Sequence, residues 1–245
     1  MQLRLYFQTP EPLTLPLSYH SILQGFIYDK LSSEPEYSSF LHDIGYIEDK
    51  KPFKLFVYSL LESEEKEISP PYITFRNSFS FEIRSPMNVF CDIFYLALMH
   101  SDKYRIGSKE VLLQGCVATK RVIDESDITV RTLSPICLNR TCIENNSKKT
   151  VYLKPSDDDF ADSINTNFHN KYKAAFGIAP SGDICIEPVK FTEKNKYVTK
   201  FGKNIIVVAY NGKYRLSGDP ANLTFLYDSG IGAKNSQGFG MFELT

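Results

Sequence analysis

The sequence contains no tryptophan, and it has only five cysteines and four histidines in 245 residues. The cysteines form no Cys-x-x-Cys pair and no Cys/His cluster with the spacing of a zinc site. They are Cys91, Cys116, Cys137, Cys142 and Cys185. An odd number of cysteines with no disulfide pattern is typical of a protein in a reducing compartment. We therefore expect a cytoplasmic protein without structural disulfides or a metal centre.

Long hydrophobic runs are also missing. No apolar stretch approaches the roughly 20 residues that cross a bilayer, and the N-terminal segment MQLRLYFQTPEP has no apolar region of the kind found in signal peptides. We therefore expect no membrane partner. The hydrophobic content of 42% still suffices for packed cores in one large domain or two small ones.

Neither sign of charge dominates, because 28 basic residues face 29 acidic ones and the net charge is −1. This balance argues against indiscriminate binding of polyanions. The charges are nevertheless segregated along the chain. Residues 190–215 contain one acidic residue and seven basic ones, namely Lys190, Lys194, Lys196, Lys200, Lys203, Lys213 and Arg215. The sequence thus predicts a basic stripe on a neutral protein.

The first half of the chain predicts the order β-α-β-β-α-β. The expected strands are Leu3–Phe7, Lys54–Leu60, Tyr72–Arg84 with an interruption at Asn77-Ser78, and Leu112–Ala118. One helix begins near Ser18, a shorter helical segment spans Pro35–Asp43, and Ser85-Pro86 supplies the N-cap and first residue of a second long helix. This order is that of a ferredoxin-like domain.

The second half repeats the same order after a polar linker at 120–127. We expect a strand at 128–138, a hairpin around Asn145-Asn146, a helix over Ser156–Phe176 that stops at Gly177, and two strands within 184–213. Asp219-Pro220 opens a last helix. The predicted fold is α+β, with two tandem ferredoxin-like, RRM-like domains at 1–119 and 128–245 and a cleft between them.

A glycine-rich loop lies close to the C-terminus. Two Gly-x-Gly pairs, Gly230/Gly232 and Gly238/Gly240, flank five residues that include Lys234. Glycines at this spacing allow positive φ and expose successive N–H groups, which form a nest of donors for phosphate oxygens. A single pair would favour a plain helix-to-strand turn. Two pairs around Lys234-Asn235-Ser236 favour a phosphate-binding loop.

Polar side chains stand apart from the apolar faces of the first two helices. The first helix buries a stripe of apolar residues at helical spacing, namely Tyr19, Ile22, Leu23, Phe26 and Ile27. Tyr28 lies roughly opposite Tyr19, with Gln24 on its side, so its hydroxyl is available. His42 lies off the apolar face of the second helix, and Lys54 begins the next strand.

Four segments together give a family resemblance. They are the terminal Gly-x-Gly-x5-Gly-x-Gly loop, Leu15-Pro16-Leu17-Ser18-Tyr19-His20-Ser21-Ile22-Leu23-Gln24-Gly25-Phe26-Ile27-Tyr28, Phe40-Leu41-His42-Asp43 and Lys54-Leu55-Phe56-Val57-Tyr58-Ser59-Leu60. The chain resembles, nearly from end to end, the CRISPR-associated endoribonucleases that cut repeat RNA, within the repeat-associated mysterious protein superfamily. The resemblance implies cleavage of precursor transcripts without metal or cofactor, and a triad of Tyr28, His42 and Lys54.

The residue types suit that chemistry. RNA carries its own nucleophile, the 2′-hydroxyl, so the protein must move protons and stabilise charge on the phosphorane. His42 is suited to act as base or acid near pH 7, Lys54 to stabilise the non-bridging oxygens, and Tyr28 to position the phosphate or act as the acid. His20, His100 and His169 read as surface or hydrogen-bonded buried residues. The expected RNA contacts are Gly230, Gly232, Lys234, Asn235, Ser236, Gly238, Gly240, Lys200 and Lys203.

Two other classes of function stay open. A structural RNA-binding subunit would keep the fold and the glycine loop without cutting, and a nucleotide-sensing module would use the loop alone. The presence of all three triad side chains favours the nuclease. Asp157-Asp158-Asp159 precedes a helix, whose dipole accounts for it better than a metal site does. The expected partners are CRISPR repeat RNA and subunits of a CRISPR interference complex, and the protein is expected to be a monomer or homodimer.

Overall fold

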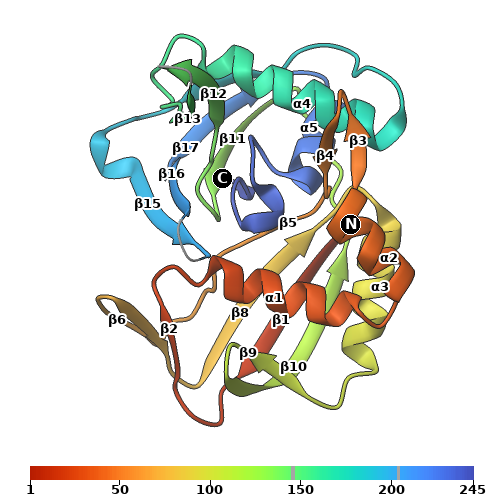
Figure 1. The fold of residues 1–245 in the computed structure, drawn as a ribbon, viewed down its shortest axis with the longest axis vertical. Helices are drawn as coiled ribbons and strands as arrows, with labels where there is room; N and C mark the ends of the chain where they lie inside the picture. The colour runs from red at the N-terminus through yellow and green to blue at the C-terminus, as the bar shows by residue number, and fades with distance from the viewer. Residues whose placement is uncertain (145–146, 203–204) are drawn as a thin grey trace.

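A computed structural model describes residues 1–144, 147–202 and 205–245. The chain forms two halves, drawn one below the other in Figure 1, and each half has an antiparallel sheet covered by helices on one face. The helices are α1 (His20–Leu31), α2 (Pro35–Ser39), α3 (Asn88–Met99), α4 (Phe160–Phe176) and α5 (Pro220–Ser229). No helix in the described residues is long and apolar enough to cross a membrane.

The N-terminal sheet has the strand order β5-β8-β1-β10-β9. Its strands are β1 (Gln2–Gln8), β5 (Val57–Tyr58), β8 (Ser78–Arg84), β9 (Tyr104–Ile106) and β10 (Lys109–Thr119). The first and third strands of the β-α-β-β-α-β unit, β1 and β8, are central, and α1 and α3 pack on one face. This is the predicted ferredoxin-like arrangement.

The C-terminal sheet has the equivalent order, β14-β17-β11-β18. Its strands are β11 (Asp127–Thr132), β14 (Cys185–Pro188), β17 (Lys213–Ser217) and β18 (Phe242–Leu244), and its helices are α4 and α5. The structure and the predicted fold class therefore agree: the molecule has tandem ferredoxin-like units. Asp219 caps α5 as predicted, because its side chain accepts a hydrogen bond from the amide of Ala221 at 2.8 Å.

The remaining strands lie outside the two main sheets. One small sheet combines β2 (Leu13–Pro16), β6 (Lys66–Ser69) and β7 (Tyr72–Phe75), and three hairpins pair β3 (Tyr46–Glu48) with β4 (Lys51–Phe53), β12 (Asn139–Glu144) with β13 (Ser147–Tyr152), and β15 (Lys196–Phe201) with β16 (Ile205–Tyr210). The hairpin predicted around Asn145-Asn146 is β12-β13, although those two residues lie outside the described ones. In Figure 1 the β3-β4 hairpin reaches from the N-terminal half up to α4.

Several predicted boundaries were wrong. Residues 184–213 were predicted to form two strands. The structure has four strands in or entering this range, namely β14, β15, β16 and the first residue of β17. The helix predicted from Ser156 begins at Phe160. The residues before it form a turn in which the Lys154 amide donates a hydrogen bond to the Asp157 carboxylate. α3 begins at Asn88 rather than at Pro86, because the Ser85 hydroxyl accepts the Met87 amide at 3.0 Å in a turn before the helix.

The segment that was predicted as the strand Lys54–Leu60 departs most from expectation. Only Val57 and Tyr58 pair with β8, because Leu55 takes a left-handed backbone conformation with φ 52°. The Leu55 side chain packs in the core of the C-terminal half and the next side chain, Phe56, packs in the core of the N-terminal half. Lys54 therefore stands where the chain passes between the two cores.

Candidate active site

One face of α1 points toward the C-terminal half. His20, Gln24 and Tyr28 recur every fourth residue, so they lie on successive turns of the same side of the helix. Gln24 donates to the carbonyl oxygen of Ser236 in the glycine loop at 2.7 Å. The hydroxyl of Tyr28 was predicted to be available beside Gln24, and the structure places both on this face, opposite the buried Tyr19.

His42 lies on the single π-helical turn Phe40–Ile44, which closes when the Gly45 amide donates to the Phe40 carbonyl at 2.7 Å. The His42 side chain is 72% exposed, which leaves it accessible to a substrate. Its Nδ1 lies 2.6 Å from a carboxylate oxygen of Asp43. Asp43 therefore orients the imidazole through Nδ1, so the other ring nitrogen, Nε2, is the one left for proton transfer.

Lys54 reaches back to the turn that carries His42. Its Nζ donates to the backbone carbonyl of His42 at 2.7 Å. Gly45 makes room for this contact: its φ is +72°, and a Cβ there would lie 2.7 Å from the carbonyl oxygen of Phe53 and 3.2 Å from Cδ of Lys54. Only glycine fits this position without moving Lys54.

The structure brings the three predicted triad residues together. The rings of Tyr28 and His42 meet edge to face with centroids 5.7 Å apart, and Lys54 contacts the His42 backbone. Burial raises the pKa of Tyr28 to about 12, so its phenol stays protonated and acts as a donor at neutral pH. Burial also lowers the pKa of Lys54, against an opposing effect of the Asp43 carboxylate.

The glycine loop crosses the centre of the molecule in Figure 1, between α5 and β18. All four predicted glycines have positive φ, from 71° at Gly232 to 85° at Gly238. They are buried, and the space that a side chain would need is filled by protein atoms. The amides of Gly230, Gly238 and Gly240 donate to the carbonyls of Leu226, Asn235 and Pro135. These glycines therefore shape the loop, and these three amides are already occupied.

The outward part of the loop is the short stretch from Lys234 to Ser236. Lys234 itself has a left-handed backbone with φ 61° and precedes a single 3-10 turn. Within the described residues, no backbone acceptor bonds the amides of Lys234, Asn235 and Ser236. Successive free amides of this kind form an anion-binding nest. This part of the loop keeps the geometry that the sequence predicts for a phosphate contact.

The side chain of Asn235 is engaged within the protein, so the backbone amide is the part of this residue left for the predicted RNA contact. Its side-chain amide donates to the carbonyls of Ile231 at 3.1 Å and Phe239 at 2.9 Å, and its oxygen accepts from Lys171 at 3.1 Å. The side chain thus ties the two ends of the loop together. Lys171 was not singled out from the sequence, although its apolar position on α4 was an available signal. Gln24 was named only as a neighbour of Tyr28.

A cleft of about 810 Å³ lies between the halves. It is lined on one side by residues 51–56, which include Lys54, and on the other by Gly232 to Gln237 of the glycine loop. β12 and α4 complete the wall. Because Lys54 both contacts His42 and lines this cleft, the triad stands at the edge of a space bounded by the loop amides.

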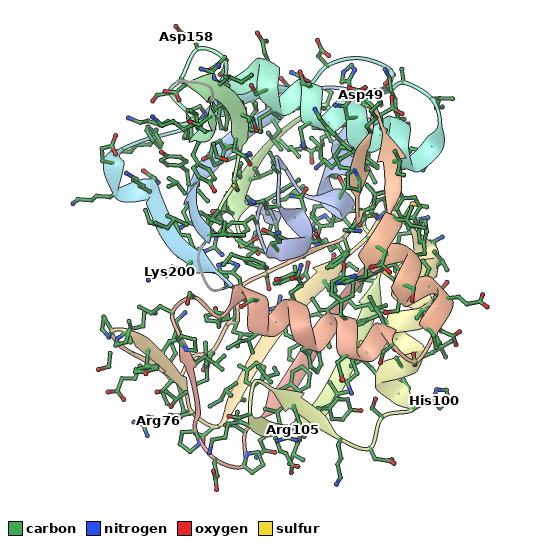
Figure 2. All side chains as sticks on the ribbon, in the orientation of Figure 1. Asp49, Arg76, His100, Arg105, Asp158 and Lys200 are labelled. Carbon is green, nitrogen blue, oxygen red and sulfur yellow. The ribbon has the colours of Figure 1, made fainter. Side chains whose placement is uncertain are left out.

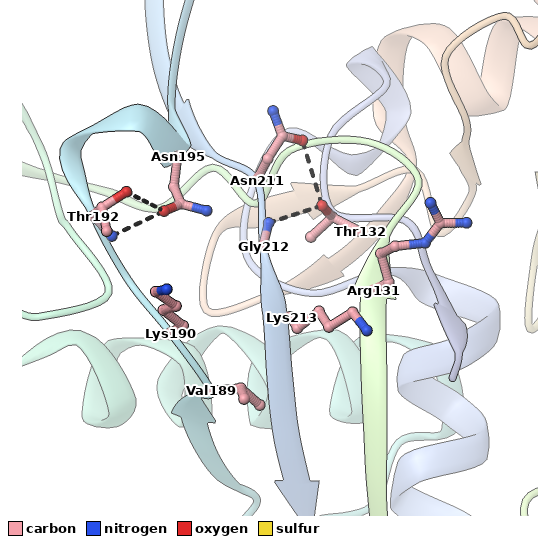
Figure 3. A pocket seen from close by; sticks show the side chains of 9 residues that line it. All are labelled: Arg131, Thr132, Val189, Lys190, Thr192, Asn195, Asn211, Gly212 and Lys213. Atoms are coloured by element: carbon pink, nitrogen blue, oxygen red, sulfur yellow. Dashed lines mark hydrogen bonds between the residues drawn. The ribbon is translucent and has the colours of Figure 1, made fainter.

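The predicted basic stripe divides among separate elements. Lys190 and Lys213 line a second pocket of about 510 Å³, together with Arg131 and the side chains of Asn195 and Asn211 (Figure 3). This pocket contains none of the triad. Lys200 is exposed on β15 and lies at the edge of the molecule in Figure 2. Lys203 lies outside the described residues. Arg215 forms an ion pair with Asp127 at 2.6 Å, which neutralises it.

The other histidines are held elsewhere, as expected. His20 is fully buried: its Nδ1 lies 3.1 Å from the Gln237 carbonyl, its Nε2 lies 3.1 Å from the Tyr197 hydroxyl, and its ring stacks on Phe239. Burial lowers the pKa of His20 to about 4. His169 lies 2.8 Å from Asp183, and His100 stands at the far edge of the N-terminal half in Figure 2.

Comparison with known proteins gives one consistent family. The family model described as CRISPR associated protein Cas6, C-terminal, matches residues 118–244, just over half of the chain. A protein of Methanocaldococcus jannaschii named CRISPR-associated endoribonuclease Cas6 1 is 29% identical over 244 residues, which cover 98% of this chain and 91% of that protein. The Pyrococcus furiosus CRISPR-associated endoribonuclease Cas6 is 26% identical over 234 residues, or 94% of this chain and 83% of that protein.

A solved structure described as CRISPR associated protein Cas6 superposes with a TM-score of 0.83 at 26% identity, covering 100% of this chain and 99% of that one. The structural match extends over both ferredoxin-like units, and the family model covers the whole of the second one together with the glycine loop. The chain belongs to the Cas6 family of CRISPR-associated proteins.

Proposed function

We propose that this protein is an endoribonuclease that cuts CRISPR precursor transcripts within their repeats. The attacking group is the 2′-hydroxyl of the RNA, and the products carry a 5′-hydroxyl and a 2′,3′-cyclic phosphate. The names of the Methanocaldococcus and Pyrococcus relatives support the class of activity. The observation that carries the proposal is the meeting of Tyr28, His42 and Lys54, which come from three separate segments, at the edge of the cleft that Lys54 lines.

Each member of the triad has a distinct task in this reaction. His42 moves the proton, because its exposed imidazole is held by Asp43 through one nitrogen and leaves the other free. Tyr28 donates a hydrogen bond from its protonated phenol. The Lys54 ammonium stabilises negative charge on the non-bridging oxygens of the phosphorane.

The RNA backbone approaches through the cleft. We place a phosphate on the free amides of Lys234, Asn235 and Ser236, with the Lys234 side chain as an additional cation. Gly230, Gly238 and Gly240, whose own amides are occupied, hold the free amides in position, and Gly232 lines the cleft beside them. Lys54 lines the same cleft, so a strand that passes the loop also reaches the triad.

The test is single-turnover cleavage of the repeat RNA from the same genome in the presence of EDTA. We expect one cut per repeat, and we expect a single 2′-deoxy substitution 5′ of the scissile phosphate to abolish cutting while binding remains. Cleavage of the deoxy substrate would rule out attack by the 2′-hydroxyl. A strict need for Mg²⁺ would instead indicate metal-assisted hydrolysis. Tight binding of the all-ribose repeat without any product would identify the alternative, a structural RNA-binding subunit.

A further inference from the structure

A lysine occupies a core position of α4. Phe160, Ile164 and Phe168 recur every fourth residue along the buried face of the helix, and Lys171 follows on the same face one turn later. Only 2% of its surface is exposed. A lysine is almost never this buried without a specific partner, so its contacts are informative.

Lys171 is held by the glycine loop. Its Nζ donates to the carbonyl of Gly230, to the carbonyl of Gly232 at 3.4 Å and to the side-chain oxygen of Asn235 at 3.1 Å. Asn235 in turn holds Ile231 and Phe239, which belong to opposite ends of the loop. A charged ammonium has three protons to donate, and the three acceptors use all of them. The contacts therefore suit the protonated form.

The three acceptors are all neutral. Within the part of the chain that the structure describes, Lys171 forms no ion pair with a carboxylate, and burial lowers its pKa to about 7. A buried charge is costly without an opposite charge nearby. Lys171 also lines the 810 Å³ cleft, as do Lys234, Asn235 and Ser236, which carry the free amides. The missing negative charge would thus be available from an anion in the cleft.

We propose that Lys171 is a positioning residue for the glycine loop and that an RNA backbone phosphate, bound on the loop amides, supplies the negative charge that balances it. The proposal rests on the proposed function, because it assigns the phosphate to the RNA. Binding of RNA then favours the protonated form of Lys171. By linkage, the protein takes up a proton when it binds RNA above about pH 7.

The other charged groups around the cleft do not replace this phosphate. Lys51, Lys54 and Lys234 line it and are all cationic, and Arg140 of β12 is paired with Asp159. β3, which packs against α4, carries the carboxylate of Glu48, but Glu48 is not among the residues that line the cleft. His20 lies against the loop, but its pKa of about 4 keeps it neutral over the relevant range. His169, two residues before Lys171 on α4, is paired with Asp183. The test removes the exposed His42 imidazole, which stands beside Lys54 at the edge of the cleft.

The test compares RNA affinity at pH 7, 8 and 9 in the His42→Ala protein, which lacks this imidazole and is not expected to cut. With Lys171 intact, we expect affinity to fall by up to tenfold per pH unit above pH 7. Lys171→Met keeps the apolar stem and removes the charge. Lys171→Met should weaken RNA binding at pH 7 by about tenfold. It should also abolish the part of the fall in affinity between pH 7 and pH 9 that comes from deprotonation of Lys171. Lys173→Met, on the same helix, is the matched control and should change neither.

A second measurement does not depend on the Lys171 variant folding. Calorimetric titration of the His42→Ala protein with repeat RNA at pH 8, in two buffers of different ionisation enthalpy, should show uptake approaching one proton. The absence of proton uptake would overturn the proposal, as would a Lys171→Met protein that is folded and keeps the full pH dependence. A wild-type protein that neither binds nor cuts repeat RNA would contradict the proposed function itself. A protein that binds and cuts without proton uptake would contradict only the role of Lys171.

Discussion

Tyr28 and His42 face each other at the site, but their surroundings give them opposite properties. The phenol is half-buried and its pKa is raised to about 12, whereas the imidazole is 72% exposed and is held by Asp43. One group therefore keeps its proton throughout the physiological range, and the other is placed to exchange it. The difference in burial between the two side chains thus assigns hydrogen-bond donation to Tyr28 and proton transfer to His42.

Tyr28→Phe removes a hydrogen-bond donor and leaves the proton carrier in place. Because the phenol is protonated well below pH 12, the loss in single-turnover rate should be the same factor at every pH between 6 and 9. A loss that grows or shrinks across this range would mean that Tyr28 itself titrates during the reaction. The measurement is the pH profile of cleavage for both proteins under saturating enzyme.

His42→Ala should be the more damaging change. We expect single-turnover cleavage to fall by about 10²-fold or more, which is the usual size of lost acid–base catalysis, with little change in RNA affinity. His100→Ala, at the far edge of the N-terminal half, is the control and should cut normally. Near wild-type cleavage by His42→Ala would remove His42 from the mechanism.

The choice of Tyr28, His42 and Lys54 as a triad came from the family resemblance and stays a prediction, whereas the residues that hold the glycine loop could not be predicted. Tyr28 and His42 stand off the apolar faces of their helices, and periodicity shows this directly. Lys171 and His20 are buried polar groups whose partners come from the distant loop, so their roles depend on tertiary contacts. Only the break in the apolar face of α4 at Lys171 pointed to an unusual residue.

Among the structural elements, the glycine loop is closely packed against its neighbours along most of its length. A Cβ at Gly240 would lie 2.0 Å from the carbonyl oxygen of Ile231, and one at Gly238 would lie 2.5 Å from the ring of Tyr58. The sequence predicted the positive φ of these glycines but not the atoms around them. Neighbours that approach from β5 and α1 cannot be read from a local pattern.

Gly240→Ala and Gly177→Ala separate backbone strain from crowding. Both glycines have positive φ, but nothing lies within 4 Å of a Cβ at Gly177. Gly177→Ala should cost about 1 kcal/mol of unfolding free energy through strain alone. Gly240→Ala should cost roughly 1–3 kcal/mol more because the added carbon must displace backbone. Urea unfolding of both variants measures the difference, and equal losses would show that the loop relaxes freely.

At the scale of the whole molecule, RNA binding should depend on few cations. The net charge is −1, and three arginines of the second half are each paired with a carboxylate, namely Arg131, Arg140 and Arg215. The predicted division into 1–119 and 128–245 remains a proposal, although the two sheets and cores follow the predicted order of elements. The basic residues of the predicted stripe are spread over several elements, because the β15-β16 hairpin lies outside the main sheet.

Lys234→Ala should flatten the slope of log affinity against log salt by about 0.7, the value for one phosphate contact on a single strand. Arg215→Ala removes the same charge from the same half, but Asp127 already neutralises Arg215, so its slope should stay unchanged. Affinities at several salt concentrations give both slopes. An unchanged slope for Lys234→Ala would mean that Lys234 contacts no RNA phosphate.

The passage of residues 54–56 between the two cores affects how such proteins can be recombined. Leu55 belongs to the C-terminal core and Phe56 to the N-terminal core, and the carbonyl of Leu55 accepts from Ser85 at 2.6 Å. A chimera that joins the N-terminal half of one relative to the C-terminal half of another would therefore place one apolar side chain in a foreign core. Lys54, next to it, would shift with that mismatch. The two halves look like separate modules, but their packing at residues 54–56 requires that they be exchanged together.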